Sequence, residues 1–170
     1  FWFSEVSELS PANGLLVRVD AQDLSVETWE LPTGAYGMTI DHQGTIWTCE
    51  REVASFDPAT ESWTVFPGLQ GVTLRDCAED GAGHLWAASA DALVRFDVED
   101  GTVMATAGLP APGLGVSIDF EGRVWVTPNG NPVVRVDVET NQVDELDGGL
   151  VDLTFYDMTG QELRNVMSLR

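Results

Sequence analysis

The sequence contains no lysine, and only two cysteines and two histidines occur among its 170 residues. All eight basic residues are arginines, against 28 aspartates and glutamates, which gives a formal net charge of −20. A protein that binds nucleic acid through its phosphates needs a basic surface, so this charge argues against nucleic acid as a partner. It argues equally against binding to anionic lipid.

Long apolar runs and common catalytic signatures are missing as well. No stretch of 18 apolar residues occurs, so no transmembrane helix is predicted. The chain also lacks a Gly-x-Ser-x-Gly elbow, a phosphate-binding glycine loop and a dinucleotide fingerprint, and its cysteines match no zinc motif. No ready-made active site is therefore visible in the sequence.

The sequence does contain a repeat with a period of 39 residues. Its clearest copies are residues 40–47 (IDHQGTIW), 79–86 (EDGAGHLW) and 118–125 (IDFEGRVW). Each copy includes an aspartate and a glycine that favour a tight turn, because aspartate bonds to nearby N–H groups and glycine accepts positive φ. A period of about 40 residues built from short strands and turns is typical of β-propeller blades.

Each repeat is predicted to form a blade of four short antiparallel strands. The fold class is therefore all-β, a β-propeller of about four four-stranded blades. The expected blades are residues 1–32, 33–68, 69–110, 111–148 and a partial blade at 149–170. Residues 1–5 match a second strand without its inner strand, and the chain stops near another second strand, so we expect a fragment of a larger propeller. A closed four-blade ring is the alternative.

The repeated tryptophans and the two cysteines are expected to lie where blades meet. Trp47, Trp86 and Trp125 are predicted to occupy equivalent buried places between neighbouring blades, because stacked sheets need large apolar side chains. Cys49 belongs to a second strand and Cys77 to the next inner strand, so a disulfide is one alternative. Two buried thiols are the interpretation that we favour.

The unit Gly-hydrophobic-Thr/Ser-Ile-Asp-x-x-Gly-x-hydrophobic-Trp resembles the streptogramin (virginiamycin B) lyase family. It is also similar to the broader group of NHL and gluconolactonase-type propellers. The resemblance rests on residues 37–41, residues 115–119, the three repeated tryptophans and residues 1–5, and it covers almost the whole chain. These are framework residues, so the resemblance implies a fold more than an activity.

The resemblance to that lyase family also implies where catalytic histidines would stand, directly before the glycine of the inner strand. The family's chemistry implies a base-assisted elimination that opens a cyclic ester with help from Mg²⁺. The corresponding residues here, none of which is histidine, are Tyr36, Arg75, Leu114 and Asp152. His42 and His84 belong to the Asp-x-x-Gly turns and are expected to be exposed to solvent. The general base that this mechanism needs is therefore missing, and no catalytic residue is predicted.

The central face of the propeller is the predicted ligand site, because inner strands start and second strands end there. The polar residues that we expect to gather on it are Glu5, Tyr36, Glu50, Arg51, Arg75 and Asp152. Such a mixed set favours a small polar ligand or a peptide. Glu5 and Glu50 are candidate ligands for Ca²⁺ or Mg²⁺, with exposed loop carboxylates as the competing interpretation.

The function predicted from the sequence is a non-catalytic propeller module that binds a small polar ligand, a peptide or a protein partner. The alternative is a lyase or lactonase-type propeller enzyme whose catalytic residues lie outside this segment. A third hypothesis is self-association through open sheet edges. We expect a bacterial, extracytoplasmic protein, either periplasmic or secreted.

Overall fold

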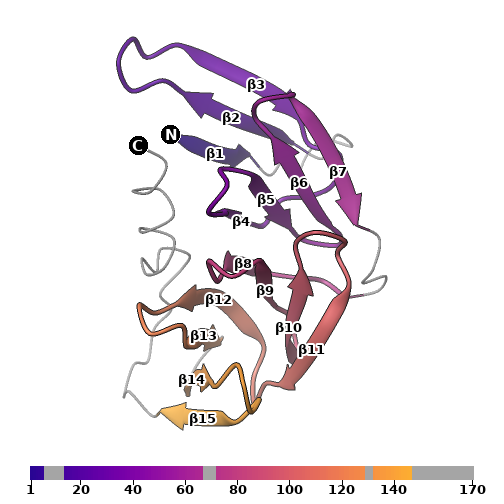
Figure 1. The fold of residues 1–170 in the computed structure, drawn as a ribbon, viewed down its shortest axis with the longest axis vertical. Helices are drawn as coiled ribbons and strands as arrows, with labels where there is room; N and C mark the ends of the chain where they lie inside the picture. Colours follow the sequence, from indigo (N-terminus) through magenta and orange to yellow (C-terminus); the bar gives the residue numbers. More distant parts are fainter. Residues whose placement is uncertain (6–13, 67–71, 129–131, 147–170) are drawn as a thin grey trace.

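The computed structural model describes residues 1–5, 14–66, 72–128 and 132–146, and this part of the chain forms four antiparallel sheets (Figure 1). No helix occurs within these ranges, and hence none that is long and apolar enough to cross a membrane. The predicted all-β propeller class is confirmed. The partial blade expected at 149–170 lies outside the described residues.

The strands of each sheet follow one another in sequence order, and every neighbouring pair is antiparallel. The first sheet contains β1 (Trp2–Glu5), β2 (Leu15–Val19) and β3 (Val26–Glu30). The second contains β4 (Gly37–Ile40), β5 (Ile46–Cys49), β6 (Val53–Asp57) and β7 (Ser62–Phe66). The third contains β8 (Asp76–Glu79), β9 (His84–Ala88), β10 (Ala92–Asp97) and β11 (Val103–Gly108). The fourth contains β12 (Gly113–Ile118), β13 (Val124–Pro128), β14 (Val133–Val136) and β15 (Val143–Leu146).

The four sheets succeed one another along an arc and correspond to four blades of a propeller (Figure 1). The inner strands β4, β8 and β12 lie toward the concave side of the arc, and β3, β7, β11 and β15 form its rim. The first blade has three described strands, and β1 occupies the second-strand position because Trp2 faces Arg18 as Trp86 faces Arg95. Strands β4 and β12 both pack against β8, so the third blade holds its neighbours together at the inner edge.

A carboxylate organises the tight turn between the first two strands of the second, third and fourth blades. In the second blade, Asp41 Oδ1 accepts hydrogen bonds from the N–H groups of Gln43 (2.8 Å) and Thr45 (2.9 Å). Its Oδ2 accepts a 2.9 Å hydrogen bond from Nε1 of Trp47. The repeated aspartate and tryptophan are thus one structural unit, which fixes the turn and the indole together.

The same unit recurs in the next two blades. Asp80 accepts from Nε1 of Trp86 at 3.3 Å, and Asp119 accepts from Nε1 of Trp125 at 2.9 Å. Burial raises the pKa of Asp119, but the hydrogen bonds from Trp125 and from the Arg123 N–H outweigh burial and hold this pKa below its ordinary value. The turn is therefore built around an ionised carboxylate.

The repeated tryptophans pack toward the following blade, and one of them departs from the sequence prediction. Trp47 and Trp86 are 3 % and 1 % exposed, and they join clusters that contain residues of the third and fourth blade respectively. Trp125 is only half-buried, so the prediction of three equally buried tryptophans is wrong. The reason is that no described blade follows β15 to cover its outer face.

Cys49 and Cys77 form a disulfide, so the favoured interpretation of two buried thiols is wrong. The bond joins β5 to β8 and therefore staples the second blade to the third. The two chain segments are already close at this point, because the Leu74 N–H donates to the Glu50 carbonyl at 2.5 Å. Both cysteines are buried, which places the bridge inside the interface between these blades.

Candidate functional site

A pocket of about 720 Å³ opens between the second and third blades. It lies at the end of the blades where the Asp-x-x-Gly turns are found. Most of its lining side chains are polar, and the indole of Trp47 and the phenyl ring of Phe66 also line it. The lining residues that the argument below uses are Asp41, His42, Trp47, Ser55, Thr64, Phe66, Asp97 and Glu99.

One wall of the pocket is the face of the second blade. Trp47 lies on β5, and Ser55 is its cross-strand partner on β6. Ser55 pairs in turn with Thr64 on β7, so three neighbouring strands each contribute one side chain. Phe66 stacks on Trp47 with ring centroids 5.4 Å apart and planes inclined by 26°. This wall therefore consists of the stacked rings of Trp47 and Phe66 with the hydroxyl groups of Ser55 and Thr64 beside them.

The opposite wall consists of two turns of the third blade. The turn at residues 80–84 and the turn at residues 97–102 are joined by a 3.1 Å hydrogen bond from the Val98 N–H to the Gly83 carbonyl. Gly101, with φ of +71°, packs directly against the Phe66 ring, where a side chain would not fit. The second wall is therefore locked to the first at the rim of the pocket.

The second blade differs from the other three at the position opposite its tryptophan. In those blades an arginine faces the tryptophan across the strands, and its guanidinium lies over the indole ring. The three pairs, with the distance from the guanidinium carbon to the ring centroid, are Arg18–Trp2 at 5.8 Å, Arg95–Trp86 at 5.3 Å and Arg135–Trp125 at 5.9 Å. Ser55 takes the arginine's place in the second blade. The pocket lies at this position, where the repeat lacks its long cationic side chain.

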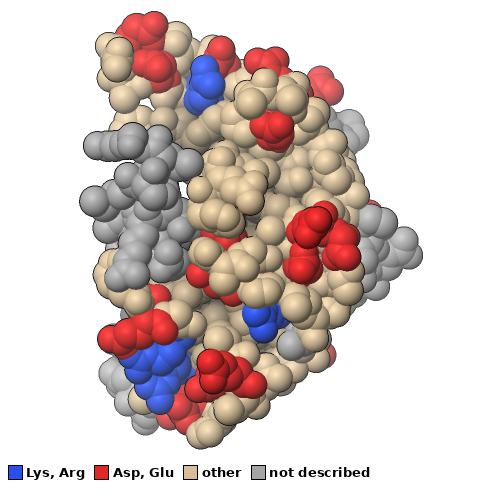
Figure 2. Space-filling model, viewed as in Figure 1, with Lys and Arg blue, Asp and Glu red and all other residues tan. Residues whose placement is uncertain are grey.

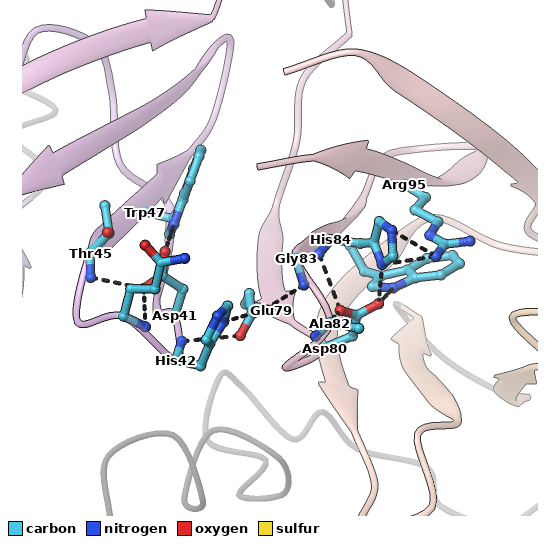
Figure 3. A network of polar contacts seen from close by, with 12 residues as sticks. Asp41, His42, Thr45, Trp47, Glu79, Asp80, Ala82, Gly83, His84 and Arg95 are labelled. Carbon is cyan, nitrogen blue, oxygen red and sulfur yellow. Dashed lines mark hydrogen bonds and ion pairs between the residues drawn. The ribbon is translucent and has the colours of Figure 1, made fainter. Parts of the chain in front are cut away.

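A second departure from the repeat lies at the inner edge of the same interface. Glu79 ends β8 at a position where the neighbouring blades carry Ile40 and Ile118, and its side chain is fully buried. Its carboxylate accepts from the N–H groups of His42 (3.3 Å) and Gly83 (3.2 Å). The oxygen Oε1 also lies 3.2 Å from Nδ1 of His42 (Figure 3). A buried carboxylate thus ties the turn of the second blade to the third.

The two histidines of the turns lie in different surroundings. His42 is 39 % exposed at its side chain, whereas the His84 side chain is 19 % exposed, so the prediction of a solvent-exposed His84 is wrong. Nδ1 of His84 lies 2.9 Å from Asp80 Oδ2 and 2.8 Å from Arg95 Nη2. Its ring is turned away from His42, toward Arg95 (Figure 3). His84 belongs to the arginine–tryptophan stack of the third blade.

The charge around the pocket is negative. Asp41, Asp97 and Glu99 line it, and none of the described lining residues is an arginine. On the face of the molecule shown in Figure 2, acidic side chains form several clusters and basic ones are few. The field of such a surface attracts cations and repels anions.

The predicted central-face residues come together only in part. The guanidinium of Arg75 lies over the Tyr36 ring, 5.3 Å from its centroid, so these two do meet from neighbouring blades. The Glu50 carboxylate rests against Gly34, two residues before Tyr36. Arg51 is exposed in the connection between β5 and β6, and Asp152 lies outside the described residues.

The proposed cation ligands, Glu5 and Glu50, lie in different blades. Glu5 ends β1, and Glu50 directly follows β5. Among the described residues, no group of three or more histidine, cysteine, aspartate or glutamate side chains is arranged to hold a metal ion. A Ca²⁺ or Mg²⁺ site at Glu5 and Glu50 stays a prediction.

Sequence reasoning missed the residues that distinguish the pocket, although the signal was present. Aligning the third strands sets Ser55 against Arg18, Arg95 and Arg135. Aligning the inner strands sets Glu79 against two isoleucines. Both signals are single departures from a repeat, and their meaning depends on knowing which side chains face each other across strands.

Comparison with known proteins identifies the fold of the chain but shows no closer relationship to any of them. Neither a protein-family model nor a curated protein matches the chain. Among solved structures, it is similar to virginiamycin B lyase from Staphylococcus aureus, with a TM-score of 0.67 and 16 % identity over 84 % of this chain and 54 % of the lyase. It is also similar to the extracellular domain of BT4673 from B. thetaiotaomicron, with a TM-score of 0.68 and 12 % identity over 91 % of this chain and 22 % of that chain.

A third similar structure is hydrazine synthase from Kuenenia stuttgartiensis, with a TM-score of 0.60 and 16 % identity over 75 % of this chain and 38 % of that chain. The chain thus spans about half the length of the lyase and less of the other two. Identities this low establish the β-propeller fold alone. The resemblance to the virginiamycin B lyase fold, inferred from the repeat, is confirmed at this level.

Proposed function

We propose that this chain is a non-catalytic propeller module that binds a small polar ligand, or a polar side chain of a peptide or protein, in the pocket between its second and third blades. The observation that carries the proposal is the pocket itself. Its volume of about 720 Å³ falls within the range of ligand sites, roughly 300–1,000 Å³. Its lining places the rings of Trp47 and Phe66 beside polar side chains from both blades.

The pocket is a better candidate than the central face for a physical reason. Two walls from different blades flank it, and they are held by the disulfide, the His42–Glu79 contact and the Phe66–Gly101 packing. A site whose walls are fixed in advance loses little conformational entropy on binding. The Tyr36–Arg75 pair on the central face stays a second predicted site.

The disulfide supports the expected extracytoplasmic location. Disulfides persist in oxidising compartments and are rare in the cytosol. We therefore keep a periplasmic or secreted location as part of the proposal, and self-association through open sheet edges stays a prediction.

The proposal is tested with the tryptophan indoles as built-in probes. The indole ¹H–¹⁵N signals of the labelled chain are assigned with single Trp→Phe variants, and the chain is titrated with amino acid amides, monosaccharides and short carboxylic acids. We expect at least one class to shift the signal of Trp47 while the signals of Trp86 and Trp125 stay in place. The repeat itself thus supplies the matched controls. Titrations that leave Trp47 unmoved, or that move all three indoles alike, would contradict a site at this pocket.

The enzyme alternative has a separate test. The positions where the lyase resemblance implies histidine hold Tyr36, Arg75 and Leu114 instead. The purified chain is incubated with a cyclic depsipeptide and Mg²⁺, and the substrate is followed by mass spectrometry. We expect the substrate to stay intact. Turnover that is lost in a His42→Ala variant would replace the binding proposal by a catalytic one.

A further inference from the structure

One side chain of the pocket is a base that a buried carboxylate holds in place. We propose that His42 contacts the ligand of the pocket through Nε2, that Glu79 is its positioning residue, and that the group it receives is an alkylammonium, such as a lysine side chain carries. The inference rests on the proposed function and narrows it to one ligand class.

The first argument is the orientation of the His42 ring. Glu79 is fully buried, and its two carboxylate oxygens accept hydrogen bonds from the N–H groups of His42 and Gly83. A carboxylate that accepts at both oxygens favours a protonated Nδ1 as its third donor, and Nδ1 of His42 lies 3.2 Å from Oε1. In the neutral ring Nε2 is then a hydrogen-bond acceptor, because only one of the two nitrogens carries a proton.

The second argument is that this acceptor is unused. The His42 side chain lines the pocket and is 39 % exposed. Within the described ranges of the chain, Nε2 of His42 has no protein partner. The other histidine of the pocket differs, because both ring nitrogens of His84 lie within 3.1 Å of Nη2 of Arg95. His42 therefore supplies the pocket with an acceptor that a ligand can use.

The third argument is the charge that lines the same pocket. Asp97 and Glu99 belong to the wall formed by the third blade. Oδ1 of Asp97 accepts from the Glu99 N–H at 2.8 Å, and in the described part of the chain neither Oδ2 of Asp97 nor the Glu99 carboxylate has a further partner. The field of these carboxylates attracts a cation and repels an anion. A ligand group that both donates hydrogen bonds and carries a positive charge meets both requirements of the pocket.

An ammonium fits this set of groups better than a guanidinium or a hydroxyl does. A guanidinium is planar and gains from stacking on an aromatic ring. Trp47 is only 3 % exposed and Phe66 is stacked on it, so the Trp47 ring offers no free face for stacking. An ammonium is a compact charge with three donors and needs no such face. A neutral hydroxyl could donate to His42 but would leave the carboxylates uncompensated.

The test compares three probes that share one side chain: N-acetyl-lysine amide, its Nε-trimethyl derivative and its Nε-acetyl derivative. The trimethyl probe keeps the charge without an N–H donor on the side chain, and the acetyl probe keeps one N–H without the charge. Binding is followed by the ring ¹H–¹³C signals of the two histidines at constant ionic strength and about pH 8, where an ordinary imidazole is neutral. We expect the lysine probe to shift the His42 signal and to bind about tenfold more tightly than either derivative, because it alone combines charge with donors.

The role of Glu79 is tested by measuring which nitrogen of His42 is protonated. Long-range ¹H–¹⁵N spectra of the labelled chain distinguish a protonated ring nitrogen from an unprotonated one. We expect a protonated Nδ1 and an unprotonated Nε2 in the unmodified chain. Glu79→Gln should weaken this preference, because the glutamine amide can itself donate to Nδ1. A merely structural Glu79 would leave the protonated nitrogen unchanged, and a protonated Nε2 in the unmodified chain would overturn the inference.

A pair of matched variants tests the assignment to His42. His42→Leu removes the acceptor, and Phe120→Leu introduces the same residue at the equivalent turn position of the fourth blade. With the Trp47 indole signal as the readout, His42→Leu should weaken binding of the lysine probe about tenfold. Phe120→Leu should leave binding unaffected. The comparison of probes needs no variant, so it decides the inference even if His42→Leu fails to fold.

The outcomes separate the two proposals. If the trimethyl or the acetyl derivative binds as tightly as the lysine probe, the pocket binds ligands but the inference is wrong. If sugars or carboxylic acids shift the Trp47 signal and the lysine probe shifts neither Trp47 nor His42, the proposed function holds and the inference is again wrong. If no compound shifts either signal, both proposals are wrong.

Discussion

The second and third blades share the same turn and tryptophan but differ in the side chain that faces the tryptophan across the strands. Each has a turn aspartate bonded to the Nε1 of its tryptophan, and each tryptophan is almost fully buried. In the third blade Arg95 covers the indole of Trp86, whereas in the second Phe66 stacks on Trp47 and a pocket opens beside Ser55. The comparison teaches that the repeat encodes the fold, and that a site arises where one blade departs from it.

The departures concentrate at one interface. Ser55, the buried Glu79 and the disulfide all lie between the second and third blades. The Glu79–His42 contact and the disulfide each connect the second blade to the third. The pocket is thus an opening in an interface that is reinforced around it.

The largest expected effect comes from the tryptophans. Trp86→Ala should lower the free energy of unfolding by about 3–5 kcal/mol, because it leaves a large cavity between two described blades. Trp125→Ala should cost clearly less, because Trp125 is half-buried. Urea unfolding followed by circular dichroism measures both. Equal losses, or a loss below 1 kcal/mol for Trp86→Ala, would contradict the packing role.

The disulfide should have the next largest effect. It closes a loop with a sequence separation of 28 residues, for which about 3–4 kcal/mol of stabilisation is expected. Reductant should lower the melting temperature of the unmodified chain, and the double variant Cys49→Ala/Cys77→Ala should melt low with or without it. If reductant leaves the melting temperature of the unmodified chain unchanged, the disulfide does not form.

The Glu79–His42 contact should contribute less. Glu79→Gln keeps the shape but weakens the hydrogen bonds that reach the buried carboxylate, so a loss of about 1–3 kcal/mol is expected. Glu99→Gln, an exposed change in the same blade, should stay within about 0.5 kcal/mol. The comparison is read from urea midpoints of the two variants. Matching losses would mean that the buried carboxylate has no special structural role.

The smallest effect concerns acid. The pKa of Asp119 is lower in the folded chain than its ordinary value, so its ionised form stabilises the fold above the unfolded pKa, near pH 4. That stability is lost as the pH falls through the lower folded pKa. Urea midpoints between pH 5 and pH 2.5 should therefore decline more steeply for the unmodified chain than for Asp119→Asn. Parallel declines would contradict the carboxylate's role in the turn.

Much of the fold could be predicted from sequence because it is repeated. The Asp-x-x-Gly turn and the tryptophan at 47, 86 and 125 recur at constant spacing, and each repeat of a signal supports the others. The half-burial of Trp125 could not be predicted in the same way, because burial depends on which blade covers it. The disulfide likewise depends on the distance between two blades, which a sequence separation does not give.

The candidate site was harder to predict for the opposite reason. Ser55 and Glu79 occur once each, so a search for shared patterns passes over them. Their significance follows only from the register, which sets Ser55 across from Trp47, and from the burial of Glu79 against the turn of the preceding blade. Tyr36 and Arg75 were predicted to share a face, and they do meet, because both precede inner strands of neighbouring blades.

The central claim is that the pocket lies where Ser55 replaces the arginine that the other three blades carry. A crystal structure of the Ser55→Arg variant tests it most directly. The account predicts that the introduced side chain lies in the pocket beside the stacked rings of Trp47 and Phe66 and fills it. An introduced side chain that extends into solvent, with the pocket still open beside Trp47, would contradict the account.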